Sequence, residues 1–193
     1  MQHKTLSLAA IIAVVSSACA RNSELPSDFR QLLARGRIAA VTDPHFVSAD
    51  KATLRGDSWV LGVVMNGESK AYSLNLLNSH EIVNDTVGGV PVAVSFCPLC
   101  NSAIAFDRRL DGVVYDFGTS GSLRYSDLIM WDRQTESWWQ QLTGEAIIGE
   151  LAGRRLNFLP APIISWADFK AANPGSQVLS REIGNPRDYG RNP

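Results

Sequence analysis

The 193-residue sequence has little of what usually marks a function directly. It has only three cysteines and three histidines, so the set of soft metal ligands is small. It has no basic stripe, and 18 Lys and Arg against 19 Asp and Glu give a net charge of −1, which argues against nucleic acid as a partner. It also lacks repeats, low-complexity blocks and, beyond its first twenty residues, any apolar run of membrane-spanning length.

The first twenty residues, MQHKTLSLAAIIAVVSSACA, have the pattern of a bacterial secretory signal, with Lys4 before an apolar run over 6–15. Ser16-Ser17-Ala18-Cys19 resembles a lipobox, which predicts a lipid on Cys19 and attachment to a membrane. Small residues on both sides of Cys19 also fit ordinary signal peptidase, which would remove it. We therefore expect an exported lipoprotein on the periplasmic side of the outer or inner membrane, or otherwise a periplasmic or secreted protein.

The rest of the chain predicts one domain. Residues 21–36 are expected to form a polar tether and a short helix over 28–35 with Ser27 as its N-cap, and residues 37–193 a single globular domain. After removal of the signal, roughly 175 residues are enough for one hydrophobic core.

Local patterns predict many short strands and few helices. Asn66-Gly67 between the apolar runs 59–65 and 68–73 predicts a β-hairpin, and short helices are expected over 74–80 and 166–172. We expect a mainly β fold, built of antiparallel sheets or a partly open barrel with a few short peripheral helices. An α+β fold is the alternative.

Further strands are expected through the second half of the chain. Segments 145–150 and 154–159 are expected to pair with each other, whereas the glycine-rich stretch FGTSGS (117–122) is interpreted as a tight turn between strands. Ser120 lacks the flanking elbow of a serine nucleophile, and the stretch lacks the Lys of a P-loop.

Four blocks carry a resemblance to a known family. They are HEIVND (80–85), GGVPVAVSFCPLCNSAIAFDR (88–108), FGTSGSLRYSDLIMWDRQTESWWQQ (117–141) and WADFKAANPGSQVLS (166–180). The sequence resembles the exported bacterial and archaeal family known as domain of unknown function 3179, over roughly 37–193. This resemblance implies no activity. In the family pattern the position of Cys100 can also be Thr, which implies that Cys97 is the more functional thiol.

The motif Cys97-Pro-Leu-Cys100 follows an apolar run and admits three interpretations. A thiol–disulfide exchanger needs its first cysteine at a helix N-terminus, but the residues that follow alternate like a strand. Export would place both cysteines in an oxidising compartment, where a disulfide can persist, so a purely structural pair is a second interpretation. A metal site is the third.

The metal interpretation needs ligands besides the two thiols. His80 lies just before a predicted hairpin that leads to Cys97, so Cys97, Cys100 and His80 are the main candidate ligands, with copper or zinc as the metal. His45 and Met130 are weaker candidates, and so is Asp85.

A polar and aromatic segment, 124–141, is a second candidate site. An exposed Trp beside amides and carboxylates suits a sugar or another small ligand, whereas the competing interpretation is core packing and structural ion pairs. The candidate ligand contacts are Arg124, Asp127, Asp132, Arg133 and Trp138.

Three function classes therefore remain open. The first is an exported domain with a Cys/His metal or thiol site, and the second is a non-catalytic envelope binding or interaction module whose cysteines are structural. An enzyme that acts through Asp and Arg side chains around residues 127–133 is the third and weakest. A substrate or a protein partner does not follow from the sequence.

Overall fold

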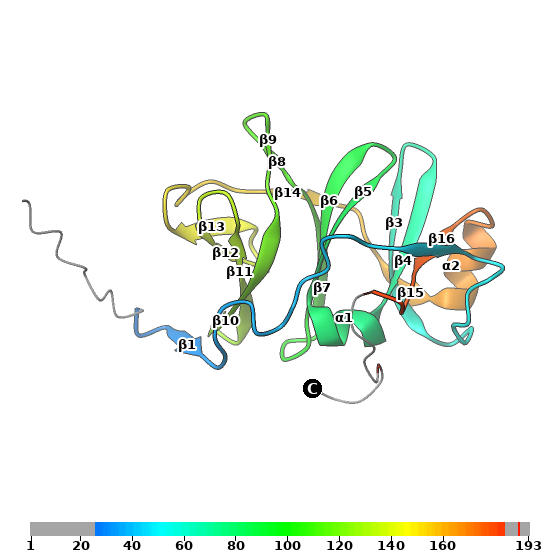
Figure 1. The fold of residues 1–193 in the computed structure, drawn as a ribbon, viewed down its shortest axis with the longest axis horizontal. Coiled ribbons are helices and arrows are strands. Elements are labelled where there is room, and N and C mark those ends of the chain that lie inside the picture. The colour runs from blue at the N-terminus through cyan, green and yellow to red at the C-terminus, as the bar shows by residue number, and fades with distance from the viewer. Residues whose placement is uncertain (1–25, 184–188, 190–193) are drawn as a thin grey trace, which may run out of the picture.

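A computed structural model describes residues 26–183 and residue 189, and it confirms a mainly β fold. The predicted signal and the lipidation of Cys19 lie outside the described residues. Three sheets follow one another along the longest axis of the molecule, and none of them closes into a barrel (Figure 1). In the described part of the chain, neither helix has the length and apolar character needed to cross a membrane.

The first sheet, which we call sheet A, has the strand order β1-β10-β11-β12-β13. Its strands are β1 (Phe29–Gln31), β10 (Phe117–Arg124), β11 (Asp127–Asp132), β12 (Trp138–Gln140) and β13 (Glu145–Ile148).

Two predictions fail in sheet A. The helix expected over 28–35 is wrong, because β1 pairs antiparallel with β10 and this tertiary pairing outweighs the local preference. The turn expected over 117–122 is also wrong, because these residues belong to β10. Its register shifts between Thr119 and Leu123, and Gly121 takes a φ of +75° within this irregular stretch.

The central sheet, sheet B, has the order β14-β7-β6-β5. Its strands are β5 (Ile82–Val87), β6 (Val90–Cys97), β7 (Ser102–Asp107) and β14 (Asn157–Leu159), with the small ribbon β8 (Arg109–Leu110) and β9 (Val113–Val114) next along the chain. The predicted pairing of 145–150 with 154–159 as two strands is largely wrong, since β14 pairs with β7. The two segments share an isolated bridge between Glu145 and Arg155 and a backbone hydrogen bond from Ala146 to Arg154.

The third sheet, sheet C, has the order β15-β3-β4-β16-β2. Its strands are β2 (Phe46–Ser48), β3 (Trp59–Met65), β4 (Glu68–Ser73), β15 (Ile163–Ser165) and β16 (Gln177–Leu179). The predicted hairpin is confirmed, with positive φ at both Asn66 and Gly67, as a two-residue I′ turn requires. All pairings in the three sheets are antiparallel except that of β4 with β16.

Both predicted helices are confirmed. Helix α1 (Leu74–His80) leads from sheet C into sheet B, and α2 (Trp166–Ala172) packs on sheet C. Ser165 caps α2 by accepting a hydrogen bond from the backbone N–H of Asp168 at 3.2 Å.

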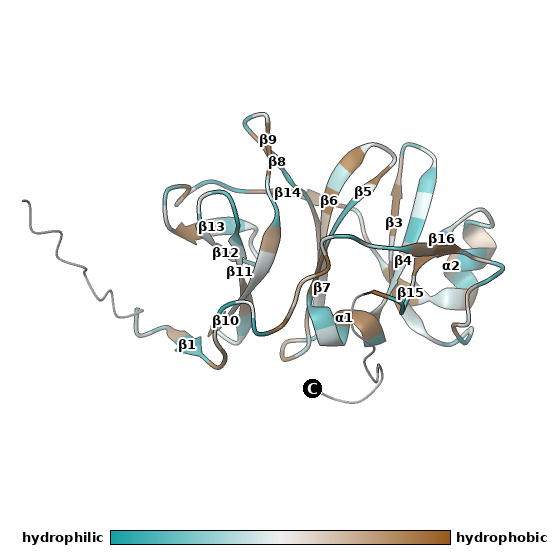
Figure 2. Cartoon of the chain, in the orientation of Figure 1, coloured by the Kyte–Doolittle hydropathy of each residue, from teal (hydrophilic) through white to brown (hydrophobic). Residues whose placement is uncertain are grey.

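Sheet B lies between two hydrophobic cores, and β6 contributes to both. Val92, Val94 and Phe96 belong to the core shared with sheet C and α1, whereas Ala93 and Cys97 belong to the core shared with sheet A. Burial on both faces explains why β6 is apolar nearly throughout (Figure 2). Cys97 therefore faces sheet A.

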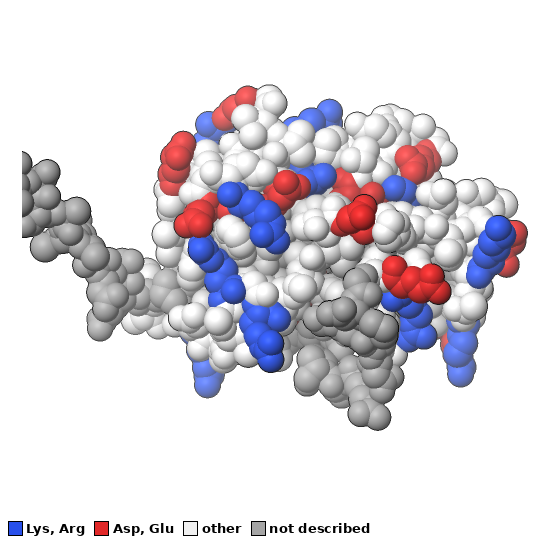
Figure 3. Space-filling model, in the orientation of Figure 1, with Lys and Arg blue, Asp and Glu red and all other residues white. Residues whose placement is uncertain are grey.

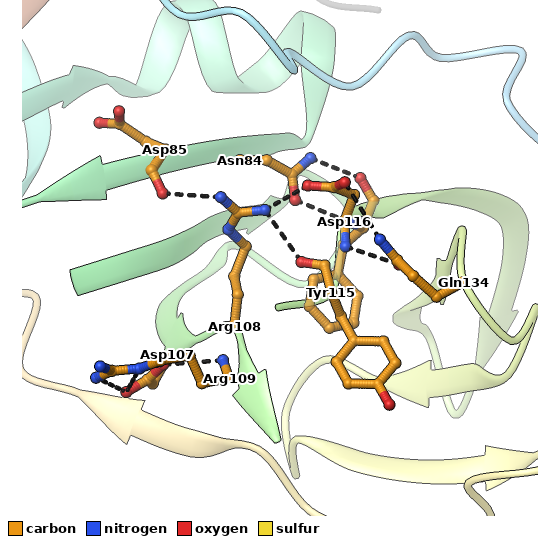
Figure 4. A network of polar contacts seen from close by, with 9 residues as sticks. Asn84, Asp85, Asp107, Arg108, Arg109, Tyr115, Asp116 and Gln134 are labelled. Atoms are coloured by element: carbon orange, nitrogen blue, oxygen red, sulfur yellow. Dashed lines mark hydrogen bonds and ion pairs between the residues drawn. The ribbon is translucent and has the colours of Figure 1, made fainter. Parts of the chain in front are cut away.

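Polar contacts fix sheet A against sheet B. The Asn84 side chain exchanges two 2.8 Å hydrogen bonds with the backbone of Phe117, and the buried Arg108 guanidinium binds the Asp116 carboxylate and the backbone carbonyls of Asp85 and Tyr115 (Figure 4). Buried polar groups of this kind are costly unless satisfied, so they favour one docking geometry. Surface charges, by contrast, are interspersed on the face drawn in Figure 3.

Candidate metal site

The candidate site forms where a turn of sheet B meets a turn of sheet A. Residues 98–101 connect β6 to β7, and Cys97 pairs with Ser102 at the base of this turn. The strand β7 confirms that the cysteine motif is followed by a strand and not by a helix. Tyr125 and Ser126, with φ of 51° and 65°, form the two-residue turn between β10 and β11, and Asp127 is the first residue of β11.

The two turns bring three potential metal ligands together. The Sγ atoms of Cys97 and Cys100 and one carboxylate oxygen of Asp127 all lie within 4.8 Å of one another. Cys100 Sγ lies 3.6 Å from Asp127 Oδ1, and Cys97 Sγ lies 3.9 Å from the carbonyl oxygen of Ser126. Asp127 was predicted as a small-ligand contact and not as a metal ligand, because no local pattern connects it to the cysteines.

Neutral donors hold the Asp127 carboxylate in place. The side chain is 1% exposed, and its Oδ2 accepts hydrogen bonds from Gln140 Nε2 at 2.5 Å and from the Leu142 backbone N–H at 2.9 Å. Among the described residues no Lys or Arg forms an ion pair with it. Asp127 is thus a buried carboxylate with Oδ1 directed at the thiols and no cationic partner.

A series of hydrogen-bonded side chains, Ser102, Gln141 and Ser95, extends from Cys100. Ser102 Oγ lies 3.0 Å from Cys100 Sγ and donates to Gln141 Oε1 at 2.7 Å, while Gln141 Nε2 donates to Ser95 Oγ at 3.1 Å. Since the Ser102 proton is used toward Gln141, the Cys100 thiol proton has two acceptors within reach, Ser102 Oγ and Asp127 Oδ1. Side chains that hydrogen-bond to a metal ligand without binding the metal hold that ligand in its orientation.

The comparison with protein families adds the identity of the domain. A family model described as "Protein of unknown function (DUF3179)" matches residues 35–193. The chain belongs to this family. Neither a curated protein nor a solved structure was found to match it. The match confirms the resemblance found in the sequence, and it includes every residue of the candidate metal site.

Both thiols of this DUF3179 domain are free in the structure. Burial, together with the neighbouring Cys100 side chain, raises the pKa of the Cys97 thiol to about 12. Cys97 is 2% exposed, whereas Cys100 is half-buried. A protonated, buried thiol is a poor nucleophile, which disfavours thiol–disulfide exchange at Cys97.

His80 is not brought into this group. Its Nδ1 lies 2.7 Å from the carbonyl oxygen of Ala39, and its Nε2 lies 2.9 Å from the hydroxyl of Tyr189. Tyr189 belongs to the core between sheets B and C, whereas Cys97 belongs to the core between sheets A and B. Both ring nitrogens therefore have protein partners away from the thiols.

Of the weaker candidate ligands, His45 and Asp85 have other partners, and Met130 shares a core with Cys97. His45 is exposed, with its Nε2 3.6 Å from Asp43. Asp85 forms a buried ion pair with Lys70 at 3.1 Å and accepts a hydrogen bond from the Tyr72 hydroxyl at 2.6 Å. Met130 is fully buried in the same core as Cys97.

The other predicted ligand contacts in the DUF3179 domain mostly have structural partners. Arg124 forms a 2.7 Å ion pair with Asp28 and lines an open cleft beside β13. Asp132 is buried and accepts from Trp139 Nε1 at 2.8 Å and from Thr135. The exposed Arg133 stacks on the Trp131 ring.

The two adjacent tryptophans follow the strand alternation that the sequence predicts. Trp139 is fully buried, whereas Trp138 is half-buried and lies against Phe29 with ring centroids 6.1 Å apart.

Proposed function

We propose that this DUF3179 domain binds a transition metal ion through Cys97, Cys100 and Asp127, and that zinc is the ion that suits this set best. Two thiolates favour zinc, copper(I) and other soft ions, whereas a carboxylate favours harder ions. Zinc accepts both ligand types, while copper(I) would gain little from Asp127. The observation that carries the proposal is the 3.6 Å approach of Cys100 Sγ to Asp127 Oδ1, within a group that also includes Cys97.

The spacing of the ligand atoms supports tetrahedral coordination. With zinc–sulfur bonds of about 2.3 Å and zinc–oxygen bonds of about 2.0 Å, tetrahedral angles place two sulfurs about 3.8 Å apart and a sulfur and an oxygen about 3.5 Å apart. The 3.6 Å between Cys100 Sγ and Asp127 Oδ1 agrees with the sulfur–oxygen distance. Because all three ligand atoms lie within 4.8 Å of one another, small side-chain movements are enough to reach tetrahedral spacing.

The charge balance of the site also favours a cation. Asp127 is buried beside two thiols and is held by amide donors rather than by an ion pair. A bound dication would displace the two thiol protons, since thiolates are the ligands that metals bind, and would place a positive charge beside Asp127. Three protein ligands leave a fourth position for water or a second molecule, as in catalytic zinc sites.

We also propose that the domain works outside the cytoplasm, attached to a membrane through lipid on Cys19. The lipobox-like pattern of residues 16–19 supports this proposal. Labelling of cells with a radioactive fatty acid should mark the wild type and not Cys19→Ser. Equal labelling of the two proteins, or none in either, would contradict it.

Metal content tests the proposed site. The protein is purified without an affinity tag under reducing conditions, and bound zinc and copper are measured together with the zinc affinity. We expect about one zinc per chain, lost in Cys97→Ser and strongly weakened in Asp127→Asn. His45→Ala serves as the control and should bind as the wild type does.

The competing function, a binding module with purely structural cysteines, predicts other results. In that case Cys97→Ser and Cys100→Ser would lower the melting temperature without changing metal content, and the wild type would hold no stoichiometric metal. Tighter binding of copper(I) than of zinc, unaffected by Asp127→Asn, would remove Asp127 from the ligand set.

A further inference from the structure

An apolar cavity lies beside the candidate metal site. It has a volume of about 220 Å³, is open to solvent on one side and is lined by residues of the 32–38 segment, the cysteine turn and strands β10 and β11. Most of its wall is aliphatic, contributed by Leu32, Leu33, Ile38, Leu99, Leu123 and Leu128. Cys97 contributes to the wall, whereas Cys100 and Asp127 do not.

Two polar side chains line this cavity, and both lack a partner within the described residues. Ser122 is 1% exposed, and its Oγ is buried without a hydrogen bond. The Glu81 carboxylate is half-buried and forms no ion pair or hydrogen bond within the same residues. Burial raises the pKa of Glu81 to about 7, as expected for a carboxylate in apolar surroundings without a counter-ion.

The backbone fixes Glu81 at this position. Glu81 follows α1 with a φ of 59°, an unusual value for a residue other than Gly, Asn or Asp. Its N–H donates to the Leu77 carbonyl at 2.6 Å, and its carbonyl accepts from the Phe96 N–H at 2.7 Å. Both backbone groups are therefore used by neighbouring elements, and the side chain of Glu81 supplies the one carboxyl group among the residues that line the cavity.

We propose that this cavity binds a small aliphatic amine, with the ammonium head donating hydrogen bonds to Glu81 and Ser122 and the hydrocarbon chain lying against the leucines. The lining contains a carboxylate and neither Lys nor Arg, so a cationic head supplies the missing counter-charge and an anionic head is repelled. Ser122 Oγ accepts a further proton of the same head.

The cavity volume guides the choice of probe ligand. At ~30 Å³ for each water-sized group, 220 Å³ accommodates about seven non-hydrogen atoms, which is the size of hexylamine. Hexylamine is an ammonium ion at neutral pH, as the Lys side chain is. 1-Hexanol and hexanoate have nearly the same body with a neutral or an anionic head, and they serve as matched probes.

Binding of the three probes is measured by calorimetry on the full chain after removal of metal with a chelator, so that no amine–metal bond contributes. We expect hexylamine to bind at least tenfold more tightly than 1-hexanol, and hexanoate to bind most weakly. In Glu81→Gln the affinity for hexylamine should fall about tenfold, to the level of 1-hexanol. Equal binding of hexylamine and hexanol, tighter binding of hexanoate, or no binding of any probe would overturn the proposal.

Two further variants keep this result separate from folding and from the metal. Ser122→Ala removes a hydroxyl without any hydrogen bond, so the fold should tolerate it, and hexylamine should bind severalfold more weakly. Unchanged affinity in a folded Ser122→Ala would remove Ser122 from the site. Cys100→Ser should lose zinc and keep hexylamine binding, because Cys100 does not line the cavity. These measurements can therefore refute the amine site without refuting the metal site, and the reverse.

Discussion

Cys100 Sγ lies 3.6 Å from Asp127 Oδ1, although the two residues are 27 positions apart and belong to different sheets, Cys100 to the β6–β7 turn and Asp127 to the start of β11. Each turn is fixed by its own hairpin, and the docking of sheet A on sheet B brings the two together. The Asn84 and Arg108 contacts that join these sheets therefore support the candidate site from a distance. The site depends on the fold as a whole rather than on the cysteine motif alone.

Replacing Gln140 by Met should weaken zinc binding without removing a ligand. Gln140 Nε2 donates to Asp127 Oδ2 at 2.5 Å and so orients the carboxylate. Loss of such a supporting partner typically lowers metal affinity about 10–100-fold. Competition with a zinc-binding dye measures the change, and Gln134→Met is the matched control because Gln134 is exposed and binds Asp116 instead. An unchanged affinity in Gln140→Met would show that Asp127 needs no such support.

The two thiols should react with an alkylating reagent in a fixed order. Cys100 is half-buried and Cys97 is 2% exposed, so we expect Cys100 to be alkylated first in the metal-free protein. Stoichiometric zinc should protect both residues. Peptide mass spectrometry over time identifies the modified cysteine; faster modification of Cys97, or no protection by zinc, would contradict the assignment.

Features governed by local chemistry were predictable from the sequence. The hairpin at Asn66-Gly67, the helix over 166–172 and its Ser165 cap each follow from a few neighbouring residues. The turn at Tyr125-Ser126 takes positive φ at both positions without Gly or Asn, so no sequence signal marks it. The strand β1 likewise forms only because β10 offers a free edge.

The candidate metal site likewise has one part that the sequence reveals and one part that it does not. Cys97 and Cys100 share one turn and are visible as a motif, whereas Asp127 joins them through the packing of two sheets. His80 was predicted as a ligand from its position before β5, but its ring nitrogens contact Ala39 and Tyr189. The register of strand pairing decides which face of a sheet a side chain points to. The short distance along the sequence from His80 to β5 does not reveal that register.

Replacing Lys70 by Met should strongly destabilise the domain. Lys70 Nζ contacts both Asp85 oxygens at 3.1 Å, and both side chains are almost fully buried. Removing one partner of a buried ion pair leaves an uncompensated charge, at a cost of about 3–5 kcal/mol. Urea denaturation measures the free energy of unfolding, with the exposed Lys51→Met as the control. A loss below about 1 kcal/mol would show that the pair is not needed.

The metal-free domain should lose stability as the pH rises from about 4.5 past 7. Burial raises the pKa of Glu81 from 4.5 to about 7, so the folded state holds this proton more tightly than the unfolded state. The full contribution is present below pH 4.5, where both states are protonated, and roughly 3 kcal/mol is lost above the folded-state value. Unfolding of the wild type and Glu81→Gln across this range isolates the effect, because only the wild type has this ionisation. Parallel pH profiles would contradict it.

X-ray absorption at the zinc edge of the zinc-loaded protein tests directly whether Cys97, Cys100 and Asp127 hold the metal. We expect two sulfur neighbours at about 2.3 Å and nitrogen or oxygen neighbours at about 2.0 Å. In Cys97→Ser, any residual zinc should have one sulfur fewer. A zinc ion without sulfur neighbours, or with the same two sulfurs after loss of Cys97, would contradict a metal site at Cys97, Cys100 and Asp127.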